Sequence, residues 1–201
     1  RPGMVEVFNS TFREAGELAE PAVAWDQFAV AEMRHETVIL EGGARIGNGP
    51  VTKVMGGAKE LVIAVCTVGS AITRRIQEYK QTEPVRSLLL DQMATLAVGQ
   101  LCERFYRWLE ADITARGLCL STYLSPGEPE WSVKDQAVIF RLLDTSLIGV
   151  SLTETMLMKP IKSLSLMAGI GDRPMGVPGT THCDFCTMKE RCPYNGVHAH
   201  I

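Results

Sequence analysis

Hydrophobic and polar residues follow two periods along this chain, and these periods predict where helices and strands lie. The longest helical pattern begins at Pro84 and continues to about Ala111, with apolar residues three or four positions apart in its first half. Pro84 suits a first helical position, because the amide that proline lacks would have no partner there. Further helices are predicted at residues 5–19, 51–59, 70–79 and 133–143.

Strand patterns lie between these helices. Leu61 to Val68 is a continuous apolar run, which is typical of a strand covered on both faces. Between Leu164 and Ile170 the even-numbered residues are all apolar and would share one face of a strand. This period of two predicts a strand buried on one face. Shorter strands are predicted at 37–40, 117–124, 148–152 and 156–158. This mixture predicts an α+β fold with helices packed on a largely antiparallel sheet.

One strand-to-helix turn, at Gly69 and Ser70, could in principle hold an anion. Ser70 is a favoured residue type for a helix N-cap, and a helix start presents amide N–H groups. Nothing else at this turn argues for phosphate, so we expect an ordinary capped helix.

Composition narrows the class of protein. The chain has 201 residues, of which 46% are hydrophobic, enough for one domain with a real core. Its net charge of −3 shows no excess of lysine and arginine, so we expect neither a nucleic-acid nor a membrane partner. The apolar run at 61–68 is too short to span a bilayer, and no signal-peptide pattern precedes it. We therefore expect a cytoplasmic protein.

The six cysteines are unevenly distributed. Three of them, at positions 66, 102 and 119, lie singly in apolar segments and are predicted to be small buried hydrophobes. Cys183, Cys186 and Cys192 crowd together, which indicates a metal site rather than a disulfide framework. We therefore divide the chain into an α+β domain at 1–175 and a cysteine-rich tail at 176–201.

The spacing in this tail suits two kinds of metal site. Cys183 and Cys186 can hold one metal centre from a single turn, and Cys192, followed by proline, adds a third thiolate. Such spacing favours a 4Fe–4S iron–sulfur cluster. With a histidine it would instead make a Cys3His zinc site, and a redox dithiol or free cysteines remain a third alternative. The fourth ligand would be a group on a partner, or one of His182, His198 and His200.

The amino-acid sequence in the middle of the chain resembles that of a known family. A Ser-Pro-Gly turn at Ser125 to Gly127 is followed by a tryptophan, a short helix and then the runs IGVSLTET, MLMKP and KSLSLMAG. This series resembles the activation (reactivation) domain of cobalamin-dependent methionine synthases. Two upstream runs look like that family's strand–helix and long-helix segments, namely AVCTVGSAITRRI and SLLLDQMATLAVGQLCERF. The resemblance covers about residues 61–171 and implies an α+β module around a bent antiparallel sheet.

The resemblance also implies a ligand site at the turn, and this chain departs from it. The family's motif, Arg-x-x-Pro-Gly-Tyr, binds S-adenosylmethionine, with the arginine pairing the ligand carboxylate. Matching Pro126 and Gly127 to that motif puts Tyr123 at the arginine and Glu128 at the tyrosine. A tyrosine hydroxyl cannot replace the two charged hydrogen bonds of a guanidinium, and a glutamate would repel the ligand carboxylate. We therefore expect weak or no binding of S-adenosylmethionine.

A further acidic residue, Glu154, matches the family's LTES-like segment. It is a candidate to line the same cleft. The alternative is a salt bridge to Lys159 or Lys162.

These signals combine into one functional hypothesis. We expect an accessory protein that docks on a cobalamin-binding methyltransferase or methionine synthase module and assists its reductive reactivation. A tail cluster would pass the electron, supplied by a ferredoxin- or flavodoxin-type donor. We find no acid–base or nucleophilic catalytic set. The alternatives are a reactivation subunit that still uses S-adenosylmethionine, and a docking scaffold whose tail is pinned by zinc.

Overall fold

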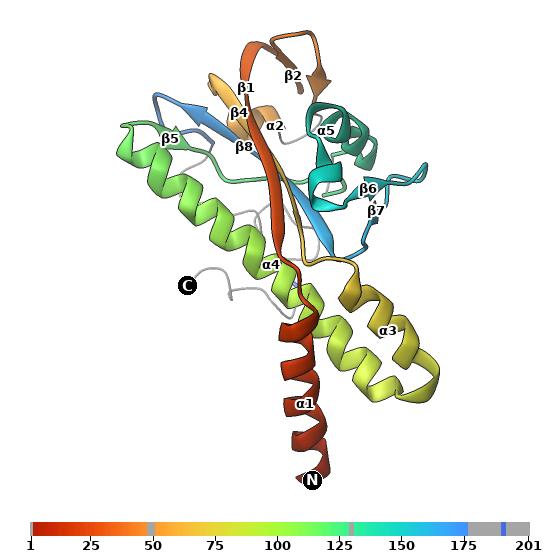
Figure 1. Cartoon of the computed structure of the whole chain (residues 1–201). Helices are drawn as coiled ribbons and strands as arrows, with labels where there is room; N and C mark the ends of the chain where they lie inside the picture. The colour runs from red at the N-terminus through yellow and green to blue at the C-terminus, as the bar shows by residue number, and fades with distance from the viewer. Residues whose placement is uncertain (1, 48–50, 129–130, 177–189, 192–201) are drawn as a thin grey trace. The chain divides into compact units, whose positions relative to one another are not determined.

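The computed structural model describes residues 2–47, 51–128, 131–176 and 190–191 (Figure 1). They form an α+β fold with a six-stranded sheet and a separate two-stranded hairpin. The described residues fall into two compact units. Unit 1 draws on segments 1–25, 64–108 and 140–165, and unit 2 draws on segments 26–63, 109–139 and 166–201. The predicted boundary between a domain at 1–175 and a tail stays a prediction, because 177–189 and 192–201 lie outside the described residues.

The six-stranded sheet has the order β3-β2-β1-β4-β8-β5. Its strands are β1 (Ala22–Arg34), β2 (Thr37–Leu40), β3 (Arg45–Ile46), β4 (Glu60–Thr67), β5 (Cys119–Leu120) and β8 (Ser163–Gly171). The pairs β1–β2, β2–β3 and β5–β8 are antiparallel. The two neighbours of β4 also run antiparallel to it, because their residue numbers decrease as those of β4 increase. On the β1 side the bonds are Val30 N to Lys59 O and Glu20 N to Val68 O. On the β8 side they are Lys59 N to Ile170 O and Val68 N to Lys162 O. The antiparallel sheet expected from the sequence is confirmed.

Sequence reasoning missed β1, a strand of 13 residues. The register of its pairing with β2 shifts between Val30 and Glu32. A bulge of this kind inserts a residue, so that a period of two cannot run through the whole strand. The segment therefore shows no sustained alternation of apolar and polar residues, although it forms one long strand.

The central strands are more deeply buried than the sequence suggested. Residues 61–67 of β4 are buried, which confirms the strand covered on both faces. For β8, burial on one face alone was wrong, because residues 165–171 are all buried and only the end at Leu164 is open. In unit 2, the segment at and after α2 (Val51–Met55) covers one face at Gly169. A Cβ at this glycine would lie 2.8 Å from the Ala58 Cβ and 3.1 Å from the Met55 Cβ.

This close approach predicts that Gly169→Ala destabilises the protein. The added methyl must displace two well-packed side chains, which costs about 1–3 kcal/mol of unfolding free energy. Gly99→Ala is the matched control, because a Cβ at Gly99, inside a helix, would meet no atom within 4 Å. That change is expected to stabilise by about 0.5–1 kcal/mol, since glycine is a poor helix former. Urea unfolding followed by circular dichroism measures both, and equal effects of the two variants would contradict the prediction.

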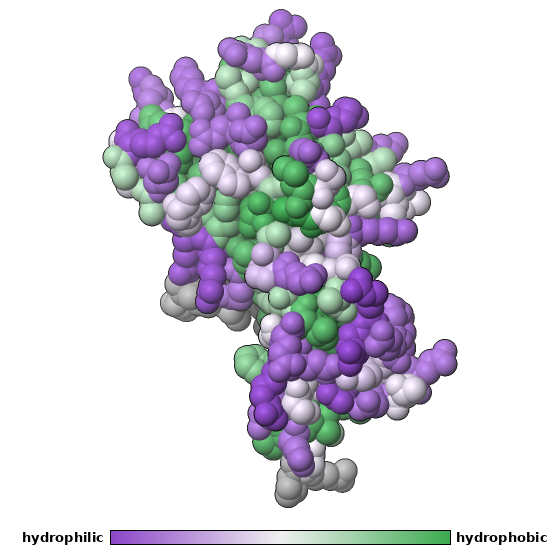
Figure 2. All heavy atoms as spheres, viewed as in Figure 1, coloured by the Kyte–Doolittle hydropathy of each residue, from purple (hydrophilic) through white to green (hydrophobic). Residues whose placement is uncertain are grey.

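The long helices lie in or extend from unit 1. They are α1 (Pro2–Leu18), α3 (Ala71–Thr82) and α4 (Pro84–Ala115), and α4 begins at Pro84 as expected. Within unit 1, α3 runs beside the first half of α4 (Figure 1), and Ile72 and Ile76 share a buried cluster with Leu90, Ala94 and Val98. The small side chain of Ala94 thus admits a close neighbour on this face of α4. The outward side of α3 is polar (Figure 2).

An ionic cluster in unit 1 joins α1 to the two neighbouring helices. The Glu14 carboxylate lies 2.9 Å from Arg75 Nη1 and 2.7 Å from Arg86 Nη2. It also accepts a hydrogen bond of 2.8 Å from the Tyr79 hydroxyl. The Glu14 side chain is only 15% exposed, so these bonds are sheltered from water. The sequence predicted a helix at 5–19 and gave no sign of this attachment.

Several shorter predicted elements are smaller than expected. The runs at 148–152 and 156–158 reduce to the paired strands β6 (Ser151–Leu152) and β7 (Met158–Lys159). The helix expected at 133–143 comprises a 3-10 turn at 133–135 and α5 (Gln136–Leu142), and a second 3-10 turn follows at 145–148. Val133, at its start, is 42% exposed. None of the helices that the structure describes combines the length and hydropathy that a bilayer crossing requires.

Candidate functional site

The Ser-Pro-Gly turn of unit 2 is held by backbone hydrogen bonds. Just before it, Leu124 exchanges two backbone bonds with Met167 of β8, at 2.9 and 2.8 Å. Within it, Glu128 N donates to Ser125 O at 3.1 Å, and Gly127 N donates to Trp131 O at 3.0 Å. Gly127 has a φ of 99°, a conformation that residues with a side chain rarely adopt. The turn is thus anchored at its base to a buried central strand.

A buried tryptophan and an aspartate fix the far side of this turn. Trp131 is 2% exposed, and its indole N–H donates to Asp135 Oδ2 at 2.8 Å. The same oxygen accepts a bond of 2.8 Å from the backbone N–H of Gly47. One carboxylate oxygen therefore joins the turn to the segment that follows β3. We call Trp131, Asp135 and Gly47 the indole lock.

Glu128 is the titratable group of the turn. Its side chain is largely buried, and Oε2 has no hydrogen-bond partner among the described residues. Burial raises the pKa of the Glu128 carboxyl to about 7. The group is therefore both an acid and a base near neutral pH, and it can donate or accept a hydrogen bond there.

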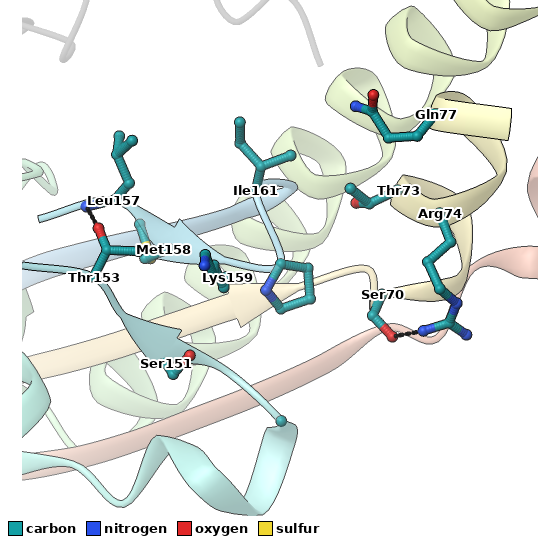
Figure 3. Close-up of a pocket in the computed structure, with 12 residues that line it drawn as sticks. Ser70, Thr73, Arg74, Gln77, Ser151, Thr153, Leu157, Met158, Lys159 and Ile161 are labelled. Atoms are coloured by element: carbon teal, nitrogen blue, oxygen red, sulfur yellow. Dashed lines mark hydrogen bonds between the residues drawn. The ribbon is translucent and has the colours of Figure 1, made fainter. Parts of the chain in front are cut away.

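Unit 1 holds a separate cleft of about 560 Å³. One wall is the start of α3, with Ser70, Thr73, Arg74 and Gln77, and the other is the β6–β7 hairpin with the segment that follows it (Figure 3). Arg74 Nη1 donates to Ser70 Oγ at 2.7 Å. The serine at the helix start therefore makes no side-chain cap, and the ordinary cap predicted from the sequence is wrong. This hydroxyl orients a guanidinium instead of capping an amide.

A comparison with solved structures finds a similar fold. A crystal structure of the MetH reactivation domain bound to AdoHcy superposes on 86% of this chain with a TM-score of 0.60 and 13% sequence identity. The chain shares the fold of that domain. It spans 66% of the length of the MetH structure. No family model and no curated protein matches the sequence. At 13% identity the likeness concerns the fold, and the AdoHcy belongs to the MetH structure.

Within this MetH-like fold, the predicted ligand residues belong to different units. Tyr123, Ser125, Pro126, Gly127 and Glu128 lie together along one segment of unit 2. Tyr123 is half-buried, and so is Ser125. Glu154 is exposed in the β6–β7 loop of unit 1. Whether any of these residues binds a ligand stays a prediction.

The alternative prediction for Glu154, a salt bridge, is wrong. No salt bridge joins it to Lys159 or Lys162 in the described part of the chain. Lys162 Nζ lies instead 2.8 Å from Asp91 Oδ1 and 2.8 Å from Thr95 Oγ1, both on α4. This pairing also explains why a carboxylate stands in the apolar part of that helix. The Lys162 side chain is 13% exposed, so changing Asp91 would leave this lysine without the one carboxylate partner that it has among the described residues.

The predicted metal ligands Cys183, Cys186, Cys192 and His198 lie outside the described residues, as do His182 and His200. Among the residues that are described, no three metal-ligating side chains gather at one point. Cys66 and Cys102 are buried, as predicted, but they are not isolated from each other. A hydrogen bond with Cys66, together with burial, raises the pKa of the Cys102 thiol, so this thiol stays protonated at neutral pH.

Sequence reasoning missed one residue of the turn in unit 2, Asp135, and two residues of the cleft in unit 1, Arg74 and Lys159. Asp135 stands in a helix start, where nothing in its neighbours marks it as the acceptor of an indole and a distant amide. Arg74 and Lys159 belong to segments far apart in the chain, so no local pattern joins them. The residue types at Gly69 and Ser70 indicated a possible anion site at the start of the helix, but nothing else at that turn argued for phosphate.

Proposed function

We propose that this chain is an accessory protein of a cobalamin-dependent methyltransferase or methionine synthase, which docks on the cobalamin-binding module and supports its reductive reactivation. The observation that carries the proposal is the fold shared with the MetH reactivation domain over 86% of the chain. The sequence runs that resemble the same family form β4, α3, α4 and β8. The sequence runs and the fold therefore lead to the same family of partners.

The turn supports a role without S-adenosylmethionine. Glu128 stands where the family's motif has its tyrosine, and its carboxyl is largely buried with a pKa raised to about 7 by that burial. Where it is ionised, it would repel the carboxylate of an amino-acid ligand. No arginine stands at the position of Tyr123 to offset this repulsion. Calorimetry with S-adenosylmethionine should therefore give no tight, saturable isotherm.

The tail supplies the alternative route to reactivation. A cluster held by Cys183, Cys186 and Cys192 would supply the single electron that converts cob(II)alamin into cob(I)alamin. A ferredoxin- or flavodoxin-type protein would return that electron to the tail. Under this proposal the folded domain provides docking, and the tail provides reduction.

The test uses the whole chain purified without oxygen. Iron, sulfide and zinc are measured first, and the chain is then mixed with the cob(II)alamin form of a methionine synthase cobalamin domain and a reduced ferredoxin. We expect iron and sulfide in the protein, and a faster loss of the cob(II)alamin paramagnetic signal when it is present. A triple variant, Cys183→Ser, Cys186→Ser and Cys192→Ser, should lose both the iron and the acceleration. Cys119→Ser, which changes a cysteine outside the tail, should keep both.

The same experiment separates the alternatives. Acceleration that survives the triple variant would exclude electron transfer through the tail. Stoichiometric zinc without visible absorbance would favour the zinc-pinned scaffold. Methyl transfer from S-adenosylmethionine to cob(I)alamin that depends on the chain would favour the methyl-donor subunit.

A further inference from the structure

The cleft of unit 1 has an unusual charge for this chain. Two cationic side chains, Arg74 and Lys159, line it, and none of its described lining residues is an aspartate or a glutamate. Neither cation forms a salt bridge with any residue that the structure describes. In contrast, the neighbouring Arg75 lies 2.9 Å from Glu14 and 3.0 Å from Glu78. A cleft with two uncompensated positive charges therefore stands out in a protein with a net charge of −3.

The two cations lie on opposite walls and are accompanied by hydroxyls. Arg74 is on α3, held through Ser70 Oγ at 2.7 Å, which leaves other N–H groups of its guanidinium for a ligand. Lys159 is on β7, across the cleft from the face of α3 that carries Thr73 and Gln77 (Figure 3). The Thr73 hydroxyl oxygen is buried and has no hydrogen-bond partner within the described segments, whereas Ser151 on β6 is exposed and lines the cleft.

The start of α3 already has a carboxylate neighbour. A Cβ at Gly69, just before the helix, would lie 2.7 Å from Glu20 Oε2, so a carboxylate stands beside the first amides. Glu20 forms no salt bridge with Arg74 or Lys159, the two cations that the described structure places on the walls of the cleft. The charge that a ligand would neutralise is carried by Arg74 and Lys159.

We propose that this cleft binds a small organic phosphate monoester. Such a group carries close to two negative charges at neutral pH and three strong acceptor oxygens, which match two cations and nearby hydroxyls. The volume of about 560 Å³ suits a small molecule rather than a lone ion. Leu157 and Ile161, which are 58% and 63% exposed, offer an apolar wall for the organic part. This site is separate from the turn of unit 2 and does not depend on the reactivation role.

Phenyl phosphate is a suitable probe, with inorganic phosphate and benzoate as comparisons. Proton–nitrogen NMR spectra of the whole chain are recorded during each titration. We expect saturable shifts of the amide signals of Thr73, Gln77 and Ser151 with phenyl phosphate, weaker binding of inorganic phosphate, and weaker binding of benzoate. Arg74→Gln and Lys159→Gln should each raise the Kd by about 10-fold or more, because each removes one charged contact. Lys80→Gln, a matched loss of charge on α3 away from the cleft, should leave the Kd unchanged.

Each other outcome overturns the proposal. Absence of saturable shifts in the millimolar range would exclude the site, and unchanged affinity in Arg74→Gln and Lys159→Gln would place the ligand elsewhere. Benzoate that binds as tightly as phenyl phosphate would show a general anion site rather than a phosphate site. The dispersion of the NMR spectra confirms that each variant is folded. Because no cobalamin protein is present, failure here leaves the test of reactivation unaffected.

Discussion

Replacing Asp135 by alanine is expected to lower the free energy of unfolding by about 2–5 kcal/mol. The change removes the shared acceptor of the indole lock and leaves two donors without it, the Trp131 indole N–H and the Gly47 amide. Both bonds are 2.8 Å long, and Trp131 is 2% exposed, so water does not replace the lost acceptor at the indole. A buried donor left without a partner costs about 1–3 kcal/mol.

Chemical unfolding at a fixed neutral pH measures this loss. Asp135→Asn keeps one oxygen acceptor and should lose less than the alanine variant. Asp172→Ala, which changes an exposed aspartate of the same unit, should stay within about 0.5 kcal/mol of the unchanged protein. If Asp135→Ala and Asp172→Ala lose the same amount, the indole lock does not stabilise the turn.

Replacing Glu128 by glutamine is expected to make the protein more stable at alkaline pH and to change little at acid pH. Burial raises the folded-state pKa of Glu128 to about 7, so the folded chain binds this proton more tightly than the unfolded chain does. Stability is therefore lost as the pH rises from the ordinary glutamate pKa of about 4.3 through about 7. Because the side chain is partly open to solvent, we expect a loss of about 1–3 kcal/mol, which the glutamine variant would not suffer.

Unfolding curves at several pH values between about 4 and 8 test this expectation. The difference in stability between Glu128→Gln and the unchanged chain should grow with pH and level off above about 7. Glu41→Gln, a change at an exposed glutamate of the same unit, should show no such trend. A difference that is constant across the range would mean that Glu128 does not titrate in this window.

The fold was predictable because its central elements have unambiguous patterns. The apolar run of β4 can be satisfied only by cover on both faces, and α4 repeats apolar residues at helical spacing from a proline start. β1 was not predicted because its bulge interrupts the alternation of apolar and polar residues. The contact between Cys66 and Cys102 was not predicted because it joins a strand to a helix distant in the sequence.

The candidate sites were less predictable, for a related reason. The residue types at 125–127 identified a turn, because glycine at a positive φ and proline have local effects. The burial of Glu128, by contrast, depends on residues distant in the sequence, and so does its pKa. Lys162 likewise pairs with Asp91 rather than with Glu154, and no local pattern contains that information.

The indole lock also gives this protein an internal optical probe. Trp131 is one of three tryptophans, and the other two, Trp25 and Trp108, are 39% and 54% exposed in unit 1. Changing those two to phenylalanine would leave the buried indole as the sole source of tryptophan fluorescence. Its backbone N–H donates to the carbonyl of Glu128 at 3.0 Å, and its ring N–H is held by Asp135. The emission of this one residue would therefore report events at the turn, from a change in protonation to the arrival of a partner, without any attached dye.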